Sequence, residues 1–330
     1  MPGRKRMSGD KKERDFQENQ TAIHKGAGTM DAFHFDTNDR LIVGCMRFAE
    51  KTPSEMGGFL SKALEKGVRV FDHADIYGDG RSERVFGVAL AAGDVRREDV
   101  VLQTKCGIRK GYYDLSKEHI LSSAEESLRR LRTDYLDVLL LHRPDALVEP
   151  EEVAAAFDEL ERSGKVRAFG LSNHRPSQIE LLKKYVDQDL IVDQLQFSLG
   201  ASGMIASGLE VNMETACAAD RDGSVLDYCR LRDITIQTWS PFQMSGWRGS
   251  FFGREEYAEL NRALEEIAAE RGETPLTIAA AWILRHPARM QLIAGTTNEK
   301  RLDEICRARQ ITLSRQEWYR LYCAAGHELP

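Results

Sequence analysis

Short apolar runs alternate with amphipathic stretches along the chain from residue 41 onward. The run at 135–142, YLDVLLLH, is almost wholly apolar, as expected of a strand buried on both faces of a parallel sheet. In residues 116–132 the apolar side chains recur at three- and four-residue steps, which indicates an amphipathic helix. The same contrast predicts strands over residues 41–48, 68–75, 100–106, 135–142, 166–173, 190–197, 235–241 and 291–296.

Helical patterns separate these predicted strands. Eight strand–helix units over about 280 residues favour a closed (β/α)8 barrel, the TIM barrel, because regular alternation implies a parallel sheet covered by helices. We expect one α/β domain over residues 38–330, with a flexible polar tail before it at 1–37 and an extra C-terminal helix at 314–325. A doubly wound Rossmann sheet is the alternative, but the sequence contains no G-x-G-x-x-G motif. The other predicted helices cover residues 54–66, 82–90, 116–132, 151–162, 176–186, 225–231, 254–271, 275–285 and 300–308.

Composition excludes several classes of protein. Of the 330 residues, 42% are hydrophobic and 30% are charged, which is typical of a globular chain. The net charge of −6 disfavours nucleic acid as the main partner, because phosphate binding needs a basic surface. The sequence has neither an apolar run of the roughly 20 residues that a membrane span requires nor the apolar stretch of a secretory signal. We expect a cytoplasmic protein with no membrane partner.

The six cysteines are scattered, with no C-x-x-C pair and no Cys/His group at zinc-ligand spacing. Isolated thiols suit a reducing compartment. His73 and Asp75 form an H-x-D pair, but the lack of a third ligand nearby favours packing at the end of a strand. The sequence therefore predicts no metal site.

Polar side chains gather where three consecutive predicted strands end. Asp72 lies in the last part of the second strand and Tyr77 follows that strand, while Lys105 lies at the end of the third and His142 ends the fourth. A TIM barrel carries its chemistry at the C-terminal ends of its strands, so these four side chains should meet at one rim. Each of them alone could be a structural polar group, but their convergence on one rim indicates a catalytic site.

Proton donation by a tyrosine is the chemistry that this set permits. A free tyrosine has a pKa of about 10, and an ammonium about 4 Å away would stabilise its phenolate by roughly 1–4 kcal/mol. We therefore expect Lys105, kept charged by Asp72, to lower the pKa of Tyr77 by about 1–3. His142 would donate a hydrogen bond to a substrate oxygen and orient it toward Tyr77. This arrangement suits reduction of a carbonyl, in which a nascent alkoxide needs a proton.

These residues lie in sequence motifs that resemble the aldo-keto reductase superfamily over residues 41–330, in particular a bacterial oxidoreductase branch with the motif DHADIYG. The resemblance implies a (β/α)8 barrel that binds NADPH, with NADH as the alternative, and has no Rossmann domain. It assigns proton donation to Tyr77, tuning of Tyr77 to Lys105 and Asp72, and orientation of the carbonyl to His142. The matching motifs are FDHADIYGDGRSE at 71–83, LQTKCG at 102–107, YLDVLLLHRPD at 135–145, GKVRAFGLSNH at 164–174, WSPF at 239–242 and IAGTTNEKRLDEI at 293–305.

The same resemblance implies a set of cofactor-binding residues. Trp239 stands where family members stack an aromatic ring on the nicotinamide, and Arg301 belongs to the site for the adenosine 2′-phosphate. Arg301 favours NADPH because a guanidinium suits a phosphate, whereas many members have a lysine where Gly295 stands and an asparagine where Ile305 stands. The full expected set is Gly44, Cys45, Met46, Asp72, Ser172, Asn173, Gln194, Trp239, Ser240, Pro241, Phe242, Gly246, Gly295, Thr296, Thr297 and Arg301.

The sequence thus predicts an NADPH-dependent oxidoreductase that reduces a small aldehyde or ketone to an alcohol, as a monomer or weak oligomer. Two alternatives come from other classes of protein. One is a regulatory or redox-sensing barrel that binds NADPH with little turnover. The other is an aldolase-type barrel that uses Lys105 as a Schiff-base nucleophile. Trp247, Phe251 and Phe252 follow the seventh strand and form either a lid over the site or a hydrophobic anchor.

Overall fold

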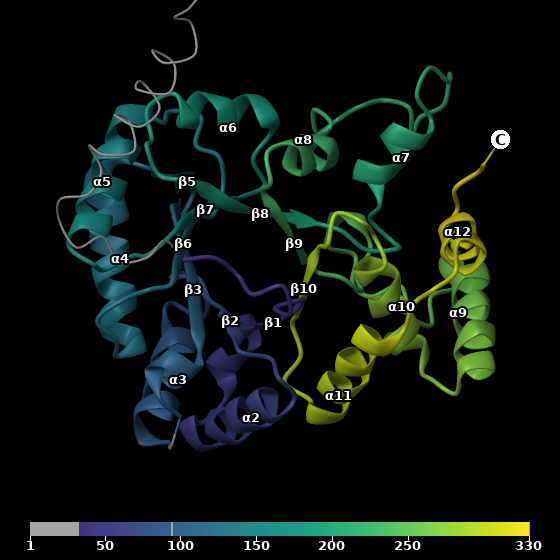
Figure 1. The fold of residues 1–330 in the computed structure, drawn as a ribbon, viewed down its shortest axis with the longest axis horizontal. Coiled ribbons are helices and arrows are strands. Elements are labelled where there is room, and N and C mark those ends of the chain that lie inside the picture. The colour runs from purple at the N-terminus through teal and green to yellow at the C-terminus, as the bar shows by residue number, and fades with distance from the viewer. Residues whose placement is uncertain (1–32, 94, 330) are drawn as a thin grey trace, which may run out of the picture. The chain divides into compact units, whose positions relative to one another are not determined.

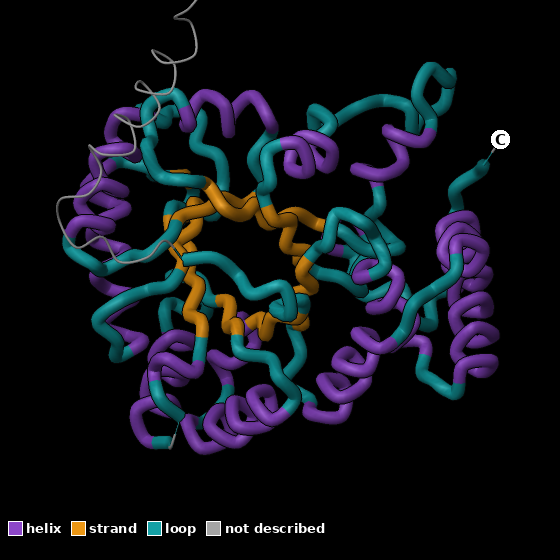
Figure 2. The backbone as a smooth tube through the Cα atoms, in the orientation of Figure 1, coloured by secondary structure: helices purple, strands orange, loops and turns teal. Residues whose placement is uncertain are grey.

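A ring of eight parallel strands forms the centre of residues 33–93 and 95–329, the part of the chain that this computed structural model describes. The first strand pairs with both the second and the last, so the sheet closes on itself, and Figure 2 shows the closed ring in orange. This confirms the predicted (β/α)8 barrel. In chain order the strands are β1 Leu41–Gly44, β2 Val70–Asp72, β3 Val101–Cys106, β6 Val138–Leu141, β7 Phe169–Ser172, β8 Leu190–Gln196, β9 Thr235–Trp239 and β10 Gln291–Ala294.

Helices surround the ring (Figure 1). Several begin at a side-chain cap: Thr52, Ser116 and Thr274 each accept a hydrogen bond from the backbone N–H three residues further on. Two additional helices, α9 (Ala258–Arg271) and α12 (Arg315–Ala324), pack against each other outside α10. The helices of the ring are α2 Pro53–Glu65, α3 Arg81–Ala92, α4 Lys117–Leu131, α5 Pro150–Arg162, α6 Pro176–Lys183, α8 Val225–Leu231, α10 Pro275–Leu284 and α11 Glu299–Arg307.

The inside of the barrel changes from apolar to polar along its axis. Alternate residues of each strand face opposite sides of the sheet, so one set meets the helices and the other fills the barrel. On β3 the inward series is Val101, Gln103 and Lys105. An apolar cluster that includes Ile42 and Val101 fills the N-terminal end. The polar residues therefore accumulate at the C-terminal ends of the strands, where the sequence predicts the site.

The element boundaries differ from the predicted ones in ways that have local causes. The first predicted strand, 41–48, is only half strand, because residues Cys45–Glu50 form a 3-10 helix (η1) after Gly44. The irregular segment after β8 contains a short helix, α7 (Gly203–Leu209), that the sequence patterns did not reveal. A small antiparallel hairpin, β4 (Ile108–Arg109) with β5 (Tyr112–Tyr113), follows β3 and was also missed.

Most of the predicted tail, residues 1–32, lies outside the described residues, so the division at residue 37 stays a prediction. Phe33 is 8% exposed and belongs to the apolar cluster at the N-terminal end of the barrel. Within residues 33–93 and 95–329, none of the helices has the length and the apolar character needed to cross a membrane.

Candidate active site

Three of the four predicted catalytic side chains form a hydrogen-bonded chain at the C-terminal rim of the barrel. Lys105 is 1% exposed, and its Nζ donates to Oδ2 of Asp72 at 2.8 Å and to Oη of Tyr77 at 3.2 Å. The backbone carbonyl of His73 accepts a third hydrogen bond from Nζ at 2.6 Å. All three ammonium protons therefore have an acceptor, and the buried cation lies directly beside the phenol.

The pKa of Tyr77 does not follow the sequence-based expectation. Burial raises the pKa of Tyr77 above its usual value of about 10 and outweighs the opposing effect of the Lys105 ammonium. The expected net lowering is therefore wrong for this structure, although Lys105 does act in the predicted direction. Burial lowers the pKa of Lys105, but Asp72 and Tyr77 together outweigh burial, so the pKa of Lys105 is raised. The lysine stays charged and the tyrosine stays protonated at neutral pH.

His142 follows β6 and faces the same cavity as Tyr77. Its ring meets that of Tyr77 edge to face, with centroids 6.1 Å apart. Burial, together with the charges of Lys105 and Arg143, lowers the pKa of His142 to about 2. The imidazole is therefore neutral and carries one N–H, which suits a hydrogen-bond donor rather than an acid.

A tight turn holds Tyr77 above the end of β2. The backbone N–H of Tyr77 donates to the carbonyl of Ala74 at 3.1 Å, and Gly78 next to it has φ +57°. A Cβ on Gly78 would lie 2.4 Å from Cβ of Ala49, so the 3-10 helix η1 packs directly against this turn. Glycine is required here for both reasons. The unexpected helix after β1 thus helps to position the phenol.

A network of buried glutamines lies beneath Asp72, and its size was not predicted. Oδ1 of Asp72 accepts hydrogen bonds from Nε2 of Gln103 and Nε2 of Gln194, each at 2.7 Å. Gln103 and Gln237 exchange two amide hydrogen bonds, of 2.9 and 3.0 Å. Gln237 continues the network to Gln291 at 2.9 Å. The Asp72 carboxylate therefore accepts three hydrogen bonds, two at one oxygen and one at the other.

The sequence does contain a signal for this network. Gln103, Gln194 and Gln237 each occupy a buried, inward position of a predicted strand, and Gln103 stands two residues before Lys105. A period-two analysis of polar residues within the predicted strands would have placed these three glutamines inside the barrel.

One cavity of 1040 Å3 connects the catalytic residues with the start of α11. This volume is at the upper end of the usual range for ligand sites, about 300–1,000 Å3. Of the expected cofactor residues, Cys45, Gly246 and Thr297 do not line the cavity, and Cys45 is fully buried. Those that do line it are Gly44, Met46, Asp72, Ser172, Asn173, Gln194, Trp239, Ser240, Pro241, Phe242, Gly295, Thr296 and Arg301.

The middle of the cavity is lined by side chains from the ends of β7 and β9. Nδ2 of Asn173 donates to Oγ of Ser172 at 2.7 Å, and Nε1 of Trp239 donates to Oδ1 of Asn173 at 3.1 Å. Asn173 and Ser240 have φ values of +61° and +51°. Left-handed backbone in residues other than glycine costs energy and is concentrated at functional sites.

Trp247 stacks on Trp239, with ring centroids 5.2 Å apart and an angle of 21° between the planes. It is 66% exposed, and it lines the cavity together with Phe252. Phe251, in contrast, is fully buried. The loop thus combines the two roles weighed from the sequence: Phe251 anchors it, and Trp247 covers part of the cavity.

The far end of the cavity combines a helix N-terminus with a cation. Oδ1 of Asn298 caps α11 by accepting from the backbone N–H of Arg301 at 3.1 Å. Arg301 is exposed and lines the cavity with Thr296. Within the described residues, its guanidinium makes no ion pair or side-chain hydrogen bond. Backbone N–H groups and a guanidinium at a helix start form a favourable environment for an anion.

Comparison with known proteins places the chain in a family. The family model described as "Aldo/keto reductase family" matches residues 40–323, so the chain belongs to this family. It is 36% identical to the uncharacterised oxidoreductase YcsN of Bacillus subtilis over 88% of this chain and 96% of that protein. It is also 34% identical to a 6-dehydroglucose reductase of Agrobacterium fabrum over 87% of this chain and 94% of that protein.

Solved structures agree with this assignment. An aldo-keto reductase from Klebsiella pneumoniae in complex with NADPH superimposes with a TM-score of 0.69 at 25% sequence identity, over 86% of this chain and 89% of that chain. The family predicted from the sequence motifs is therefore confirmed, and the protein is an oxidoreductase of the aldo-keto reductase type.

Proposed function

We propose that this protein reduces a small aldehyde or ketone to the alcohol with NADPH as the cofactor and Tyr77 as the proton donor. The observation that carries the proposal is the chain of hydrogen bonds from Asp72 through Lys105 to Tyr77, which opens into the large cavity. Members of the family act on small carbonyl compounds, and a solved family member binds NADPH.

The cavity has the donors that NADPH requires. The cavity extends from the indole of Trp239 to the exposed guanidinium of Arg301 at the start of α11. Ser172 and Asn173 would hold the carboxamide beside Trp239, and Arg301 with Thr296 would hold the 2′-phosphate. We retain Gly246 and Thr297 only for backbone contacts and assign no side-chain contact to Cys45, because that side chain is fully buried. When bound, NADPH supplies the hydride that adds to the carbonyl carbon.

The residues of the chain control the proton. His142, neutral at working pH, donates a hydrogen bond to the carbonyl oxygen and directs it toward Tyr77. Tyr77 gives its Oη proton to that oxygen as the C–O bond becomes single, and the alcohol forms. The phenolate that remains lies 3.2 Å from the Lys105 ammonium, and Asp72 holds the ammonium in place. Solvent then returns a proton to Tyr77.

The charge of Lys105 argues against the aldolase-type barrel, and an assay of turnover distinguishes the regulatory barrel from the reductase. A Schiff-base nucleophile must be a neutral amine, whereas the pKa of Lys105 is raised and its three protons are all donated. A regulatory barrel would bind NADPH without turnover, and it would therefore have no need of the hydrogen-bonded Asp72, Lys105 and Tyr77. Cytoplasmic location and a monomeric or weakly oligomeric state remain predictions from the sequence.

The test of the function compares Tyr77→Phe with the wild type and with Tyr113→Phe, which removes an exposed hydroxyl. NADPH oxidation is measured with a panel of aldehydes, ketones and oxidised sugars, the last because a relative is named 6-dehydroglucose reductase. Tyr77→Phe should lose nearly all turnover while NADPH quenches its fluorescence as in the wild type. Wild-type rates in Tyr77→Phe would overturn the role of Tyr77, and quenching without turnover on any substrate would favour the regulatory barrel.

A further inference from the structure

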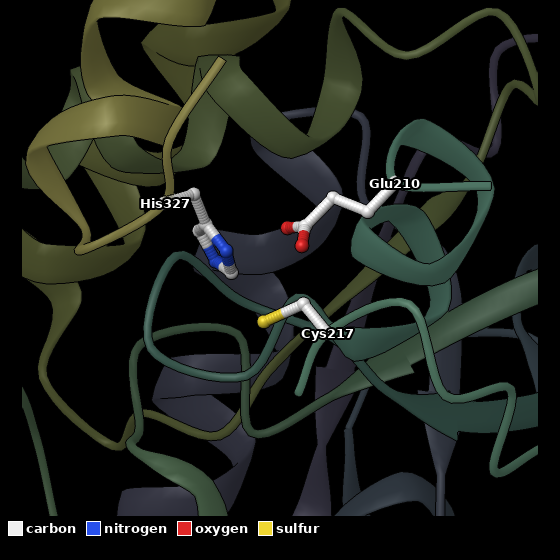
Figure 3. Close-up of side chains that lie close together, drawn as sticks. All are labelled: Glu210, Cys217 and His327. Atoms are coloured by element: carbon white, nitrogen blue, oxygen red, sulfur yellow. The ribbon is translucent and has the colours of Figure 1, made fainter. Parts of the chain in front are cut away.

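Three potential metal ligands from distant parts of the sequence meet outside the active-site cavity. Glu210 follows α7, Cys217 lies in the loop before α8, and His327 follows α12. One ligand atom from each lies within 4.8 Å of the other two. Figure 3 shows the carboxylate, thiol and imidazole converging on one point. We propose that these three side chains bind a zinc ion, which links the β8–α8 loop to the C-terminal segment.

The chemistry of the three groups suits zinc. Thiolate, imidazole and carboxylate are its usual protein ligands, at about 2.3, 2.0–2.1 and 2.0–2.2 Å. In a tetrahedral site such ligand atoms are roughly 3.5 Å apart, so the observed limit of 4.8 Å requires a contraction of at most about 1.3 Å. The thiolate of Cys217 and the carboxylate of Glu210 together balance the charge of Zn2+. Neutrality matters here because Glu210 is only 7% exposed.

The second observation concerns the imidazole of His327. Its Nε2 lies 2.7 Å from Oγ of Ser202, whereas its Nδ1 is buried without a hydrogen-bond partner among the described residues. If Nε2–H donates to the Ser202 hydroxyl, Nδ1 keeps a free lone pair. Metal-bound histidines usually have this arrangement, with the other ring nitrogen donating to a fixed acceptor. Leaving a buried acceptor unpaired costs about 1–3 kcal/mol, and a metal would remove that cost.

Neighbouring side chains hold the ligands in place. The ring of His327 stacks on that of Tyr322, with centroids 4.2 Å apart and an angle of 5° between the planes. Tyr322 is fully buried, and its hydroxyl also has no partner in the described part of the chain. The hydroxyl of Thr215 donates to Oε2 of Glu210, which leaves the other carboxylate oxygen for the metal. With three protein ligands, water would complete the tetrahedron.

This site is independent of the proposed reduction. None of the residues Glu210, Cys217 and His327 lines the 1040 Å3 cavity, so the zinc would take no part in the reduction. It also differs from the sequence-based prediction of no metal site. That prediction rested on ligand spacing along the chain, and spacing cannot reveal a site that takes its third ligand from the C-terminal segment.

The test uses the full chain after removal of metal with a chelator. Zinc binding is measured by equilibrium dialysis with metal analysis, and the coordination is probed with Co2+ as a spectroscopic substitute. We expect one zinc per chain and a thiolate-to-cobalt charge-transfer band in the near ultraviolet. Cys217→Ser should abolish this band and weaken zinc binding more than about 100-fold, at or beyond the upper end of the effect of losing a partner of a metal ligand. Zinc should also raise the Tm of the wild type but not of this variant.

Two further variants keep the result interpretable. Cys323→Ser, which alters the other partly buried thiol, should bind zinc and give the cobalt band as the wild type does. Glu210→Gln keeps the size of the side chain and its acceptor for Thr215, and it should weaken zinc binding while circular dichroism stays unchanged. The proposal is wrong if the wild type binds no zinc at micromolar concentration, or if Cys217→Ser keeps the cobalt band.

Discussion

The glutamine network predicts that a residue outside the catalytic set controls the rate through Asp72. Replacing Gln103 with leucine removes one of the two donors to Oδ1 of Asp72, at 2.7 Å, and both hydrogen bonds that Gln103 exchanges with Gln237, whose amide keeps its hydrogen bonds to Gln194 and Gln291. A hydrogen bond to a charged group contributes about 1.5–3 kcal/mol, and each neutral hydrogen bond about 0.5–1.5 kcal/mol. Gln103→Leu should therefore lose roughly 3–5 kcal/mol of unfolding free energy.

Part of this loss should appear in catalysis. Without the hydrogen bond from Gln103, the Asp72 carboxylate positions Lys105 less firmly beside Tyr77. The phenolate that remains after proton donation is then less well stabilised. If about 1.4 kcal/mol of the lost interaction is used in the transition state, kcat falls about tenfold. Because Gln103 does not line the cavity, KM for the cofactor should stay within about twofold.

The matched control is Gln291→Leu. Gln291 belongs to the same network, accepting from Gln237 at 2.9 Å and donating to the carbonyl of Asp39 at 2.6 Å, but it does not contact Asp72. It should lose a comparable stability and keep wild-type kcat. The assays are chemical denaturation and steady-state NADPH oxidation well below the Tm of both variants. Equal losses of kcat in the two variants, or full kcat in Gln103→Leu, would refute the reasoning.

Three further predictions concern single groups. Because the pKa of Tyr77 is raised and that of His142 is about 2, kcat for reduction should stay level from about pH 6 to about pH 9. It should fall only as the pH rises toward the pKa of Tyr77. An inflection near pH 6.5 in the pH–rate profile would contradict a neutral His142. Arg301→Leu should weaken NADPH binding about 10–100-fold in fluorescence titration and leave NADH binding unchanged, and equal losses for both would exclude a 2′-phosphate contact. Burial raises the pKa of Asp75 to about 6, so ionising this carboxyl destabilises the folded state. The destabilisation is absent below about pH 4 and complete above about pH 6. In urea denaturation, Asp75→Asn should therefore increase the unfolding free energy by up to about 3 kcal/mol at pH 8 and by little at pH 4.

The predicted catalytic residues that the structure brings together share one property: they stand close to strong local signals. Lys105 lies at the end of an apolar strand, His142 follows such a strand directly, and Tyr77 follows β2 after a short turn. In a parallel barrel, all strand ends meet at one rim, so knowing the strands was enough to bring these side chains together. The contact between Lys105 and Tyr77, at 3.2 Å, was therefore predictable without any long-range information.

The failures arise where a property depends on the balance of two large effects or on contacts between distant segments. The pKa of Tyr77 is the difference between burial and the field of Lys105, and the sequence shows that a cation is near without showing how little solvent remains. The 3-10 helix Cys45–Glu50 replaces the end of a predicted strand because Gly44 already completes the pairing with Asp72 on β2 and the chain must turn away toward α2.

The buried position of the phenol explains why the lysine is needed. Burial alone makes the Tyr77 phenolate costly, so an isolated tyrosine at this depth would hold its proton too tightly to donate it. A cation at 3.2 Å offsets that cost only if the cation itself survives burial, and Lys105, at 1% exposure, does so because Asp72 accepts from it at 2.8 Å. Asp72 in turn is a buried anion that two glutamine amides stabilise at its other oxygen. Lys105 thus stabilises the Tyr77 phenolate, Asp72 stabilises Lys105, and the glutamine amides stabilise Asp72. The reactivity of the phenol at the surface of the cavity therefore depends on neutral amides deep in the barrel.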